Sequence, residues 1–160
     1  MVDVTNALNE STDARSLADA DRVAGEIRQR FGALDVLFLN AGITRPQPVE
    51  AFDEATFDDL FSVNFKGQFF TLQRVLPLLH DGSSVNFTIG IGATRGTTGG
   101  PVSAATKGAL LAMMPSLALE LAPRRIRVNA AEVVAFLASD TAGYITGENI
   151  VVDGGAGLAP

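Results

Sequence analysis

Two residues in the second half of the chain have types and a spacing that suit chemistry. Ser103 and Lys107 are four residues apart in an apolar stretch that predicts a helix over residues 103–121, so both side chains belong to one helix face. A serine beside a lysine can act as a nucleophile and its base. The spacing alone favours a simpler interpretation, in which Ser103 caps the helix and Lys107 is solvated.

Two further segments contain the small residues that a nucleotide site needs. Asn40, Ala41 and Gly42 follow an apolar run, and open α/β sheets bind ligands at the carboxyl ends of their strands. An ordinary tight turn explains these three residues equally well. Segment 90–96 is rich in glycine, but residues 97–101 separate it from the next helix. A phosphate-binding loop requires the helix to begin inside the glycine motif, so this segment is not predicted to bind phosphate.

The single histidine and the single tyrosine are both predicted to be structural. His80 comes at the end of a predicted helix over residues 54–80, where it would interact with the last carbonyl groups. Tyr144 lies in a predicted loop between Gly143 and Ile145, where packing is the expected role.

Composition excludes several classes of protein. The 160 residues correspond to one domain. The net charge of −6 and the lack of a basic run predict that the chain binds neither nucleic acid nor an anionic membrane. The absence of cysteine excludes disulfides, thiolate nucleophiles and zinc–thiolate sites. No basic start precedes an apolar run, and the longest apolar stretch, residues 108–119, is too short to span a bilayer, so the expected compartment is the cytoplasm.

Helices and strands are predicted to alternate along the chain. Apolar residues recur at three- and four-residue steps from Leu17 to Phe31, which predicts a helix that Ser16 caps and Gly32 ends. Strands are predicted over residues 34–39, 85–89, 126–129 and 149–152, and the other helices over 54–80 (bent near 64–67), 103–121 and 131–139. This alternation predicts a parallel α/β sheet with right-handed crossovers.

The order of several short motifs resembles that of the short-chain dehydrogenase/reductase family. The motifs are RFGALDVL (30–37), NAG (40–42), VNFKG (63–67), LP (76–77), ATKGAL (105–110), LALELA (117–122), RIRVNA (125–130), FLASD (136–140), YITGE (144–148) and VDGG (152–155). Each motif is weak alone, but the ordered set is specific to this family.

The resemblance implies a fold and a reaction. The fold would be a partial Rossmann-type parallel sheet flanked by helices. Residues 1–160 would form one incomplete domain, with 17–155 similar to the family and 1–16 unmatched. Members of this family use NAD or NADP to move a hydride between nicotinamide and an alcohol or carbonyl carbon. The implied substrate is therefore a small alcohol or ketone.

The resemblance also assigns roles to individual residues. Lys107 matches the family lysine, which holds the nicotinamide ribose and lowers the pKa of a catalytic tyrosine. Asn64 matches an asparagine that completes a water relay to this lysine. Asn40, Ala41 and Gly42 would line the adenosine side of the cofactor site. Asp13 falls where the family has an aspartate that contacts adenine.

The sequence departs from the family pattern at three places. Residues 1–16 contain no glycine-rich phosphate loop, Ser103 occupies the position of the catalytic tyrosine, and a substrate-binding segment is missing between Ala130 and Ala131. A serine hydroxyl ionises far less readily than a phenol, whose pKa is about 10. We therefore expect weak cofactor binding and little or no turnover. We also expect strand 34–39 to be an unprotected edge.

These departures leave two alternatives to an active oxidoreductase. The first is a non-catalytic interaction subunit that forms a homo-oligomer through helices 54–80 and 103–121, whose apolar faces need a partner. The second is a gene fragment without a selected function.

Overall fold

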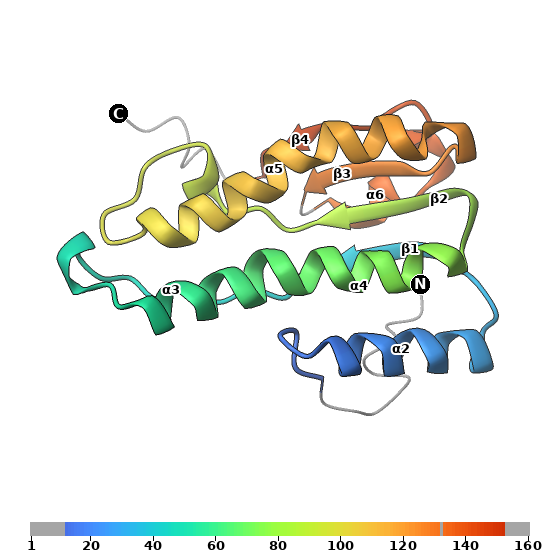
Figure 1. The fold of residues 1–160 in the computed structure, drawn as a ribbon. Helices are drawn as coiled ribbons and strands as arrows, with labels where there is room; N and C mark the ends of the chain where they lie inside the picture. Colours follow the sequence, from blue (N-terminus) through green and yellow to red (C-terminus); the bar gives the residue numbers. More distant parts are fainter. Residues whose placement is uncertain (1–11, 132, 153–160) are drawn as a thin grey trace.

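The computed structural model describes residues 12–131 and 133–152, and within them the chain forms a parallel four-stranded sheet (Figure 1). The strand order is β1-β2-β3-β4, and each neighbouring pair is parallel. The strands are β1 (Leu34–Leu39), β2 (Leu79–Phe87), β3 (Arg127–Ala131) and β4 (Asn149–Ile150). The predicted α/β class is confirmed, and β1 is an edge strand of the described sheet, as expected.

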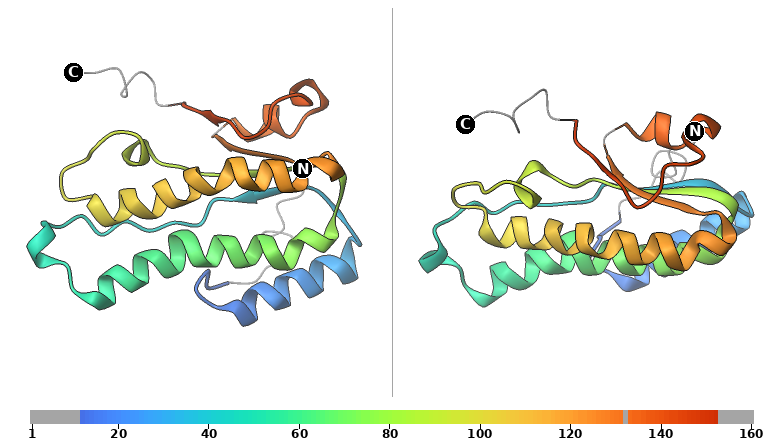
Figure 2. Two further views of the ribbon diagram at one scale, coloured as in Figure 1. Left: turned by 45° about the horizontal axis from the view of Figure 1, so that its top comes forward. Right: turned by 90° about the horizontal axis from the view of Figure 1, so that it is seen from above.

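Most helices cover one face of this sheet. In Figure 2, α2, α4 and α5 lie together on one side of the strands, and α6 lies on the other. The helices are α2 (Leu17–Arg30), α3 (Glu54–Phe61), α4 (Gln68–Val75), α5 (Pro101–Leu121) and α6 (Val134–Leu137). A π-helical segment, η2 (Ser62–Gly67), joins α3 to α4, and short 3-10 turns are found at Val49–Ala51, Leu76–Leu78, Ile91–Ala93, Ala122–Arg124 and Asp140–Ala142.

The main core forms where α4 and α5 pack on the sheet. Because side chains alternate along a strand, residues paired across β1, β2 and β3 share a face. The core face carries Leu37, Leu39, Val85, Phe87, Val128 and Ala130. Against them pack Leu72 of α4 and Leu110 and Met114 of α5, all at most 3% exposed. Full burial of one such side chain stabilises the fold by roughly 1.5–3 kcal/mol.

The opposite face of the sheet is polar and only partly covered. Ser84, Asn86, Arg127 and Asn129 share this face and are all buried. The Arg127 guanidinium donates hydrogen bonds to the carbonyls of Leu137, Ser139 and Ala142, and Ser84 Oγ donates to the Leu137 carbonyl. These bonds attach α6 to the sheet. At the β1 edge, Phe38 remains 43% exposed.

The α2 boundaries agree with the sequence prediction. Ser16 Oγ accepts a hydrogen bond from the Asp19 amide at 3.1 Å, which caps the helix. Gly32 follows the helix with φ of +76°, a conformation that strongly favours glycine.

The predicted helix over 54–80 differs in two ways from the observed structure. A π-helical segment, η2, lies where the bend was expected, and helical structure ends at Leu78, with β2 beginning at Leu79. The prediction for His80 was therefore wrong. It lies in β2, where its Nε2 is 2.7 Å from Asp35 Oδ1 of β1.

Other predicted boundaries also move. β2 starts earlier than the predicted strand 85–89 and ends at Phe87, with an irregular register between Leu34 and Val36 on its partner. The predicted helix over 131–139 shrinks to the four residues of α6 because Ala131 pairs in β3. Tyr144 is fully exposed, so its predicted packing role was wrong.

Helix α5 is longer than the apolar stretch that the sequence indicated. It has 21 residues, with Pro115 inside it, and is long and apolar enough by length and composition to cross a bilayer. However, α5 contacts β3 and contributes Leu110 and Met114 to the core. This is the arrangement of a core helix in an α/β domain.

A close backbone approach at Gly67 fixes the start of the described chain. A Cβ atom at Gly67 would overlap the carbonyl oxygen of Ala14. The glycine in the family-like VNFKG motif therefore lets residues 13–15 lie against η2. This contact brings the N-terminal segment to the same end of the molecule as Asn64.

Candidate functional site

Lys107 lies beside the carboxyl ends of β1 and β2. Its Nζ donates a hydrogen bond to the carbonyl of Thr88 at 2.8 Å. Thr88 follows β2, and its Oγ1 donates to Asn40 Oδ1 at 2.7 Å while its amide donates to the Leu39 carbonyl. The side chain of Lys107 thus reaches from α5 to the point where both strands end.

Burial changes the electrostatics of Lys107. Desolvation disfavours the charged ammonium form, so burial lowers the pKa of the Lys107 amine below its usual value. In residues 12–131 and 133–152, the polar contact of this amine is the Thr88 carbonyl, and no ion pair involves it. The sequence-based interpretation of a solvated lysine was therefore wrong.

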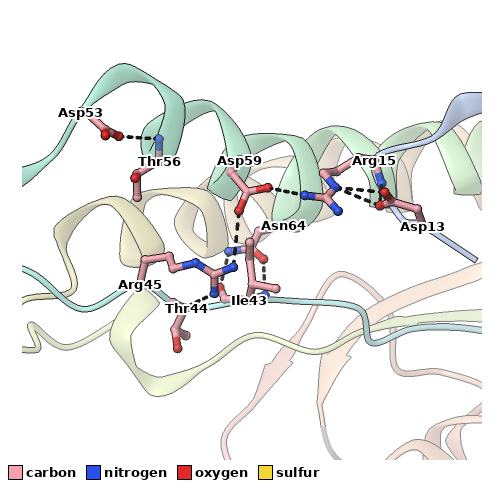
Figure 3. Close-up of polar contacts among 9 residues, drawn as sticks. All are labelled: Asp13, Arg15, Ile43, Thr44, Arg45, Asp53, Thr56, Asp59 and Asn64. Atoms are coloured by element: carbon pink, nitrogen blue, oxygen red, sulfur yellow. Dashed lines mark hydrogen bonds and ion pairs between the residues drawn. The ribbon is translucent and has the colours of Figure 1, made fainter.

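Asn64 holds the loop after β1 in place. Its Oδ1 accepts from the Ile43 amide at 2.8 Å and its Nδ2 donates to the Ile43 carbonyl at 2.9 Å (Figure 3). Nδ2 also donates to Thr106 Oγ1 at 3.0 Å. Asn64 is 1% exposed. The Asn64 amide thus pairs with both backbone groups of Ile43, as a neighbouring strand would, and it ties this loop to both η2 and α5.

Gly42 brings this loop into contact with Lys107 and Asn64. A Cβ atom at Gly42 would be 3.2 Å from Lys107 Nζ and 3.5 Å from Asn64 Oδ1. A Cβ atom at this position would require the Lys107 amine to shift by a few tenths of an ångström, so glycine allows the observed close approach. The structure therefore brings together three predicted site residues from the loop after β1, from η2 and from α5.

Ser103 differs from both sequence-based interpretations. Helix α5 begins at Pro101 after Gly100, so Ser103 is not the cap. It lies one turn before Lys107 on the same helix, and its Oγ is buried with no hydrogen-bond partner in the described structure. Its carbonyl accepts from Thr106 Oγ1 at 2.7 Å. The described contacts include no hydrogen bond between the Ser103 hydroxyl and Lys107.

Asp13 belongs to a chain of ion pairs along one side of the site. Figure 3 shows Arg15 between Asp13 and Asp59, and Arg45 on the other oxygen of Asp59. The hydrogen bond from the Arg15 side chain holds the pKa of the Asp13 carboxyl below its usual value. The adenine-contacting role of Asp13 stays a prediction.

The glycine-rich loop after β2 contains only a short turn. Residues Ile91–Ala93 form a 3-10 turn, and α5 begins at Pro101. The helix does not begin inside the glycine motif, in agreement with the prediction that this loop lacks the phosphate-binding arrangement.

Three residues of the site were missed or only touched upon by the sequence analysis. Thr88 supplies the carbonyl for Lys107, Thr106 links Asn64 to α5, and Gln68 Nε2 donates to the Ala41 carbonyl. Gln68 and Thr106 each had one signal, since Gln68 directly follows the VNFKG motif and Thr106 lies in the ATKGAL motif. Thr88 fell inside the predicted strand 85–89, whereas the observed β2 ends at Phe87.

Comparisons with known proteins agree with this arrangement. The family model described as short chain dehydrogenase matches residues 4–146. A 3-oxoacyl-[acyl-carrier-protein] reductase FabG from Staphylococcus aureus (strain Mu50) is 34% identical over 88% of this chain and 74% of the relative. The reductase of the same name from Thermotoga maritima is 33% identical over 83% of this chain and 70% of the relative.

Solved structures show the same similarity. A short-chain dehydrogenase/reductase described as glucose/ribitol dehydrogenase from Brucella melitensis has a TM-score of 0.86 at 33% identity, covering 90% of this chain and 72% of that chain. The 3-ketoacyl-(acyl-carrier-protein) reductase from the same organism, complexed with NADH, has a TM-score of 0.86 at 28% identity, covering 91% and 76%.

The Asn64 clamp gives a prediction for stability. Asn64→Leu fills a similar volume but leaves the Ile43 amide and carbonyl without their partner, so we expect a loss of about 2–3 kcal/mol in the free energy of unfolding. The matched control is Thr106→Ser, which keeps the hydroxyl and removes one buried methyl, at about 1 kcal/mol. Urea unfolding measures both, and equal midpoints for the two variants would contradict the clamp.

Proposed function

The chain belongs to the short-chain dehydrogenase family, and from this premise we propose that it binds a nicotinamide cofactor and has lost most of the family's turnover. The observation that carries the proposal is the convergence of Gly42, Asn64 and Lys107 beside the ends of β1 and β2. The proposed reaction is hydride transfer between the cofactor and a small alcohol or ketone. The proposed compartment is the cytoplasm.

The residues present fit one part of a dinucleotide. Gly42 and Asn40 are exposed next to the half-buried Lys107 amine, so a ligand can approach the backbone there. The ammonium form of Lys107 has three N–H donors, of which the Thr88 carbonyl accepts one. The remaining donors suit the hydroxyls of a ribose. When bound, the cofactor would supply or accept the hydride.

The residues of this chain would chiefly position the ligand. Asn64 fixes the backbone at Ile43 and so fixes Gly42 one residue earlier. Lys107 would hold the ribose, and Asn40, Ala41 and Asp13 would contact the adenosine side.

The proposed loss of turnover follows from Ser103. A general acid or base contributes about 10²–10⁴-fold to a rate, and a serine hydroxyl is both shorter and much less acidic than a phenol. The Ser103 hydroxyl is buried without a hydrogen-bond partner among residues 12–131 and 133–152. We propose that the chain binds cofactor and carbonyl compound without an efficient proton donor.

Cofactor binding is tested by thermal unfolding with millimolar NADH or NADPH. A ligand that binds only the folded state raises the melting temperature, and we expect about 1 kcal/mol, or about 2–4 °C. Lys107→Met should remove the shift, while Lys66→Met should keep it. A cooperative transition whose melting temperature neither nucleotide changes would contradict the proposal. The lack of any cooperative transition would favour the gene-fragment alternative.

Restoring the missing acid tests the chemistry. We expect Ser103→Tyr to increase the rate of ketone reduction, followed through NADH absorbance, by about 100-fold over the parent. Ser103→Phe is the matched control because it adds the ring without the hydroxyl, and it should leave the rate unchanged. Equal rates for the Tyr and Phe variants would show that the proton donor is not the main defect.

A second candidate function is that of a homo-oligomeric interaction subunit formed through helices 54–80 and 103–121. It is favoured by the outer side of α5, where Leu119 is 77% exposed and Ala105 and Ala112 are also exposed. An apolar surface of this kind is typical of an interface.

Light scattering over a range of concentrations tests this candidate. We expect a mass above that of the 16.7 kDa monomer, and Leu119→Lys should shift the protein toward monomer because it places a charge in the contact. Tyr144→Lys replaces a fully exposed apolar side chain outside these helices and should have no effect. A monomeric parent protein at all concentrations would exclude the candidate.

A further inference from the structure

The two lysines of the chain lie in opposite environments. Lys66 is exposed on η2, whereas Lys107 is half-buried on α5 and its pKa is lowered by burial. A primary amine attacks electrophiles only in its neutral form, so desolvation of a lysine raises its reactivity at neutral pH. The structure thus contains one candidate nucleophilic amine and one internal reference.

The contacts of Lys107 leave its lone pair available. A neutral amine can donate one N–H to the Thr88 carbonyl, at 2.8 Å, and still present the lone pair elsewhere. Its other close neighbour is Gly42, an exposed residue without a side chain. Because Gly42 is exposed and has no side chain, it marks the side from which we expect a small carbonyl compound to approach Nζ.

A hydroxyl group without a partner lies on the same helix face. Ser103 precedes Lys107 by four residues, and its Oγ is buried and has no hydrogen-bond partner in the part of the chain that the structure describes. An unpaired buried hydroxyl costs free energy, so a ligand oxygen that accepts its hydrogen bond would be stabilised.

From this geometry we propose that Lys107 captures a small aldehyde or ketone as an imine. The Nζ lone pair forms a bond to the carbonyl carbon, the C=O π electrons move to the oxygen, and a proton passes from nitrogen to oxygen to give a carbinolamine. The hydroxyl group then leaves as water together with the remaining nitrogen proton, so that the C–O and N–H bonds break and a C=N bond forms. No oxidant, reductant or nucleotide is required, and Ser103 acts as a positioning residue for the oxygen.

This activity does not rest on the proposed hydride transfer. The family's roles for the lysine are binding and proton relay, whereas here Nζ forms a covalent bond. The two functions would compete for one amine, so NADH should slow imine formation if it binds at Lys107. Imine formation in the absence of nucleotide is expected whether or not the chain binds a cofactor.

The test uses the full chain with propanal near neutral pH. Sodium borohydride reduces the imine to a stable propyl amine, and peptide mass spectrometry gives the labelled fraction at Lys107 and at Lys66. We expect initial labelling at Lys107 to exceed that at Lys66 severalfold, because burial lowers the pKa of the Lys107 amine. In concentrated urea the ratio should fall to about one, because the environments then become equivalent.

Two variants separate chemistry from structure. Lys107→Arg should abolish the rapid labelling at position 107 and leave the slower labelling at Lys66 unchanged. Ser103→Ala should reduce the labelling rate at Lys107 severalfold, while its melting temperature stays close to that of the parent protein. Equal labelling of both lysines in the folded protein, or faster labelling of Lys66, would overturn the proposal. Unchanged labelling in Ser103→Ala would remove Ser103 from it.

Discussion

The burial of one apolar sheet face against α4 and α5 is the constraint on which the remaining structure depends. Paired residues of β1, β2 and β3 place leucine, valine and phenylalanine side chains on this face, and Leu110 and Met114 of α5 close it. Because the strands are parallel, their carboxyl ends meet at one edge. The same packing that fixes α5 therefore sets Lys107 beside Thr88 and Gly42.

The sequence predicted those parts of the fold in which local signals and packing agree. The Ser16 cap, the Gly32 stop and the apolar β1 strand each depend on neighbouring residues, and all three are confirmed. The start of β2 at Leu79 could not be predicted, because its register depends on Leu34, 45 residues earlier in the chain. The helix-like pattern up to His80 hid a contact with Asp35 that only the folded sheet creates.

The candidate site was predictable in its members but not in its contacts. Asn64, Lys107 and Gly42 stood out through the family resemblance, and the structure brings them together. The burial of Lys107 was not visible, because its spacing on the helix is equally typical of a solvated face. Nor could the sequence reveal that the Ser103 hydroxyl lacks a partner, since this depends on everything that packs around it. Such long-range effects decide the chemistry of both side chains.

The edge position of β1 has a consequence for the behaviour of the protein in solution. In the described sheet, β1 pairs on one side only, with β2. Phe38 is exposed on the polar face of the sheet, in the part that α6 does not cover. An apolar edge strand is a template for a strand of another molecule, and Asp35 is the charge that opposes such pairing. The strand that delivers Asn40, Ala41 and Gly42 to the site is therefore also the edge of the described sheet that is open to pairing with another chain.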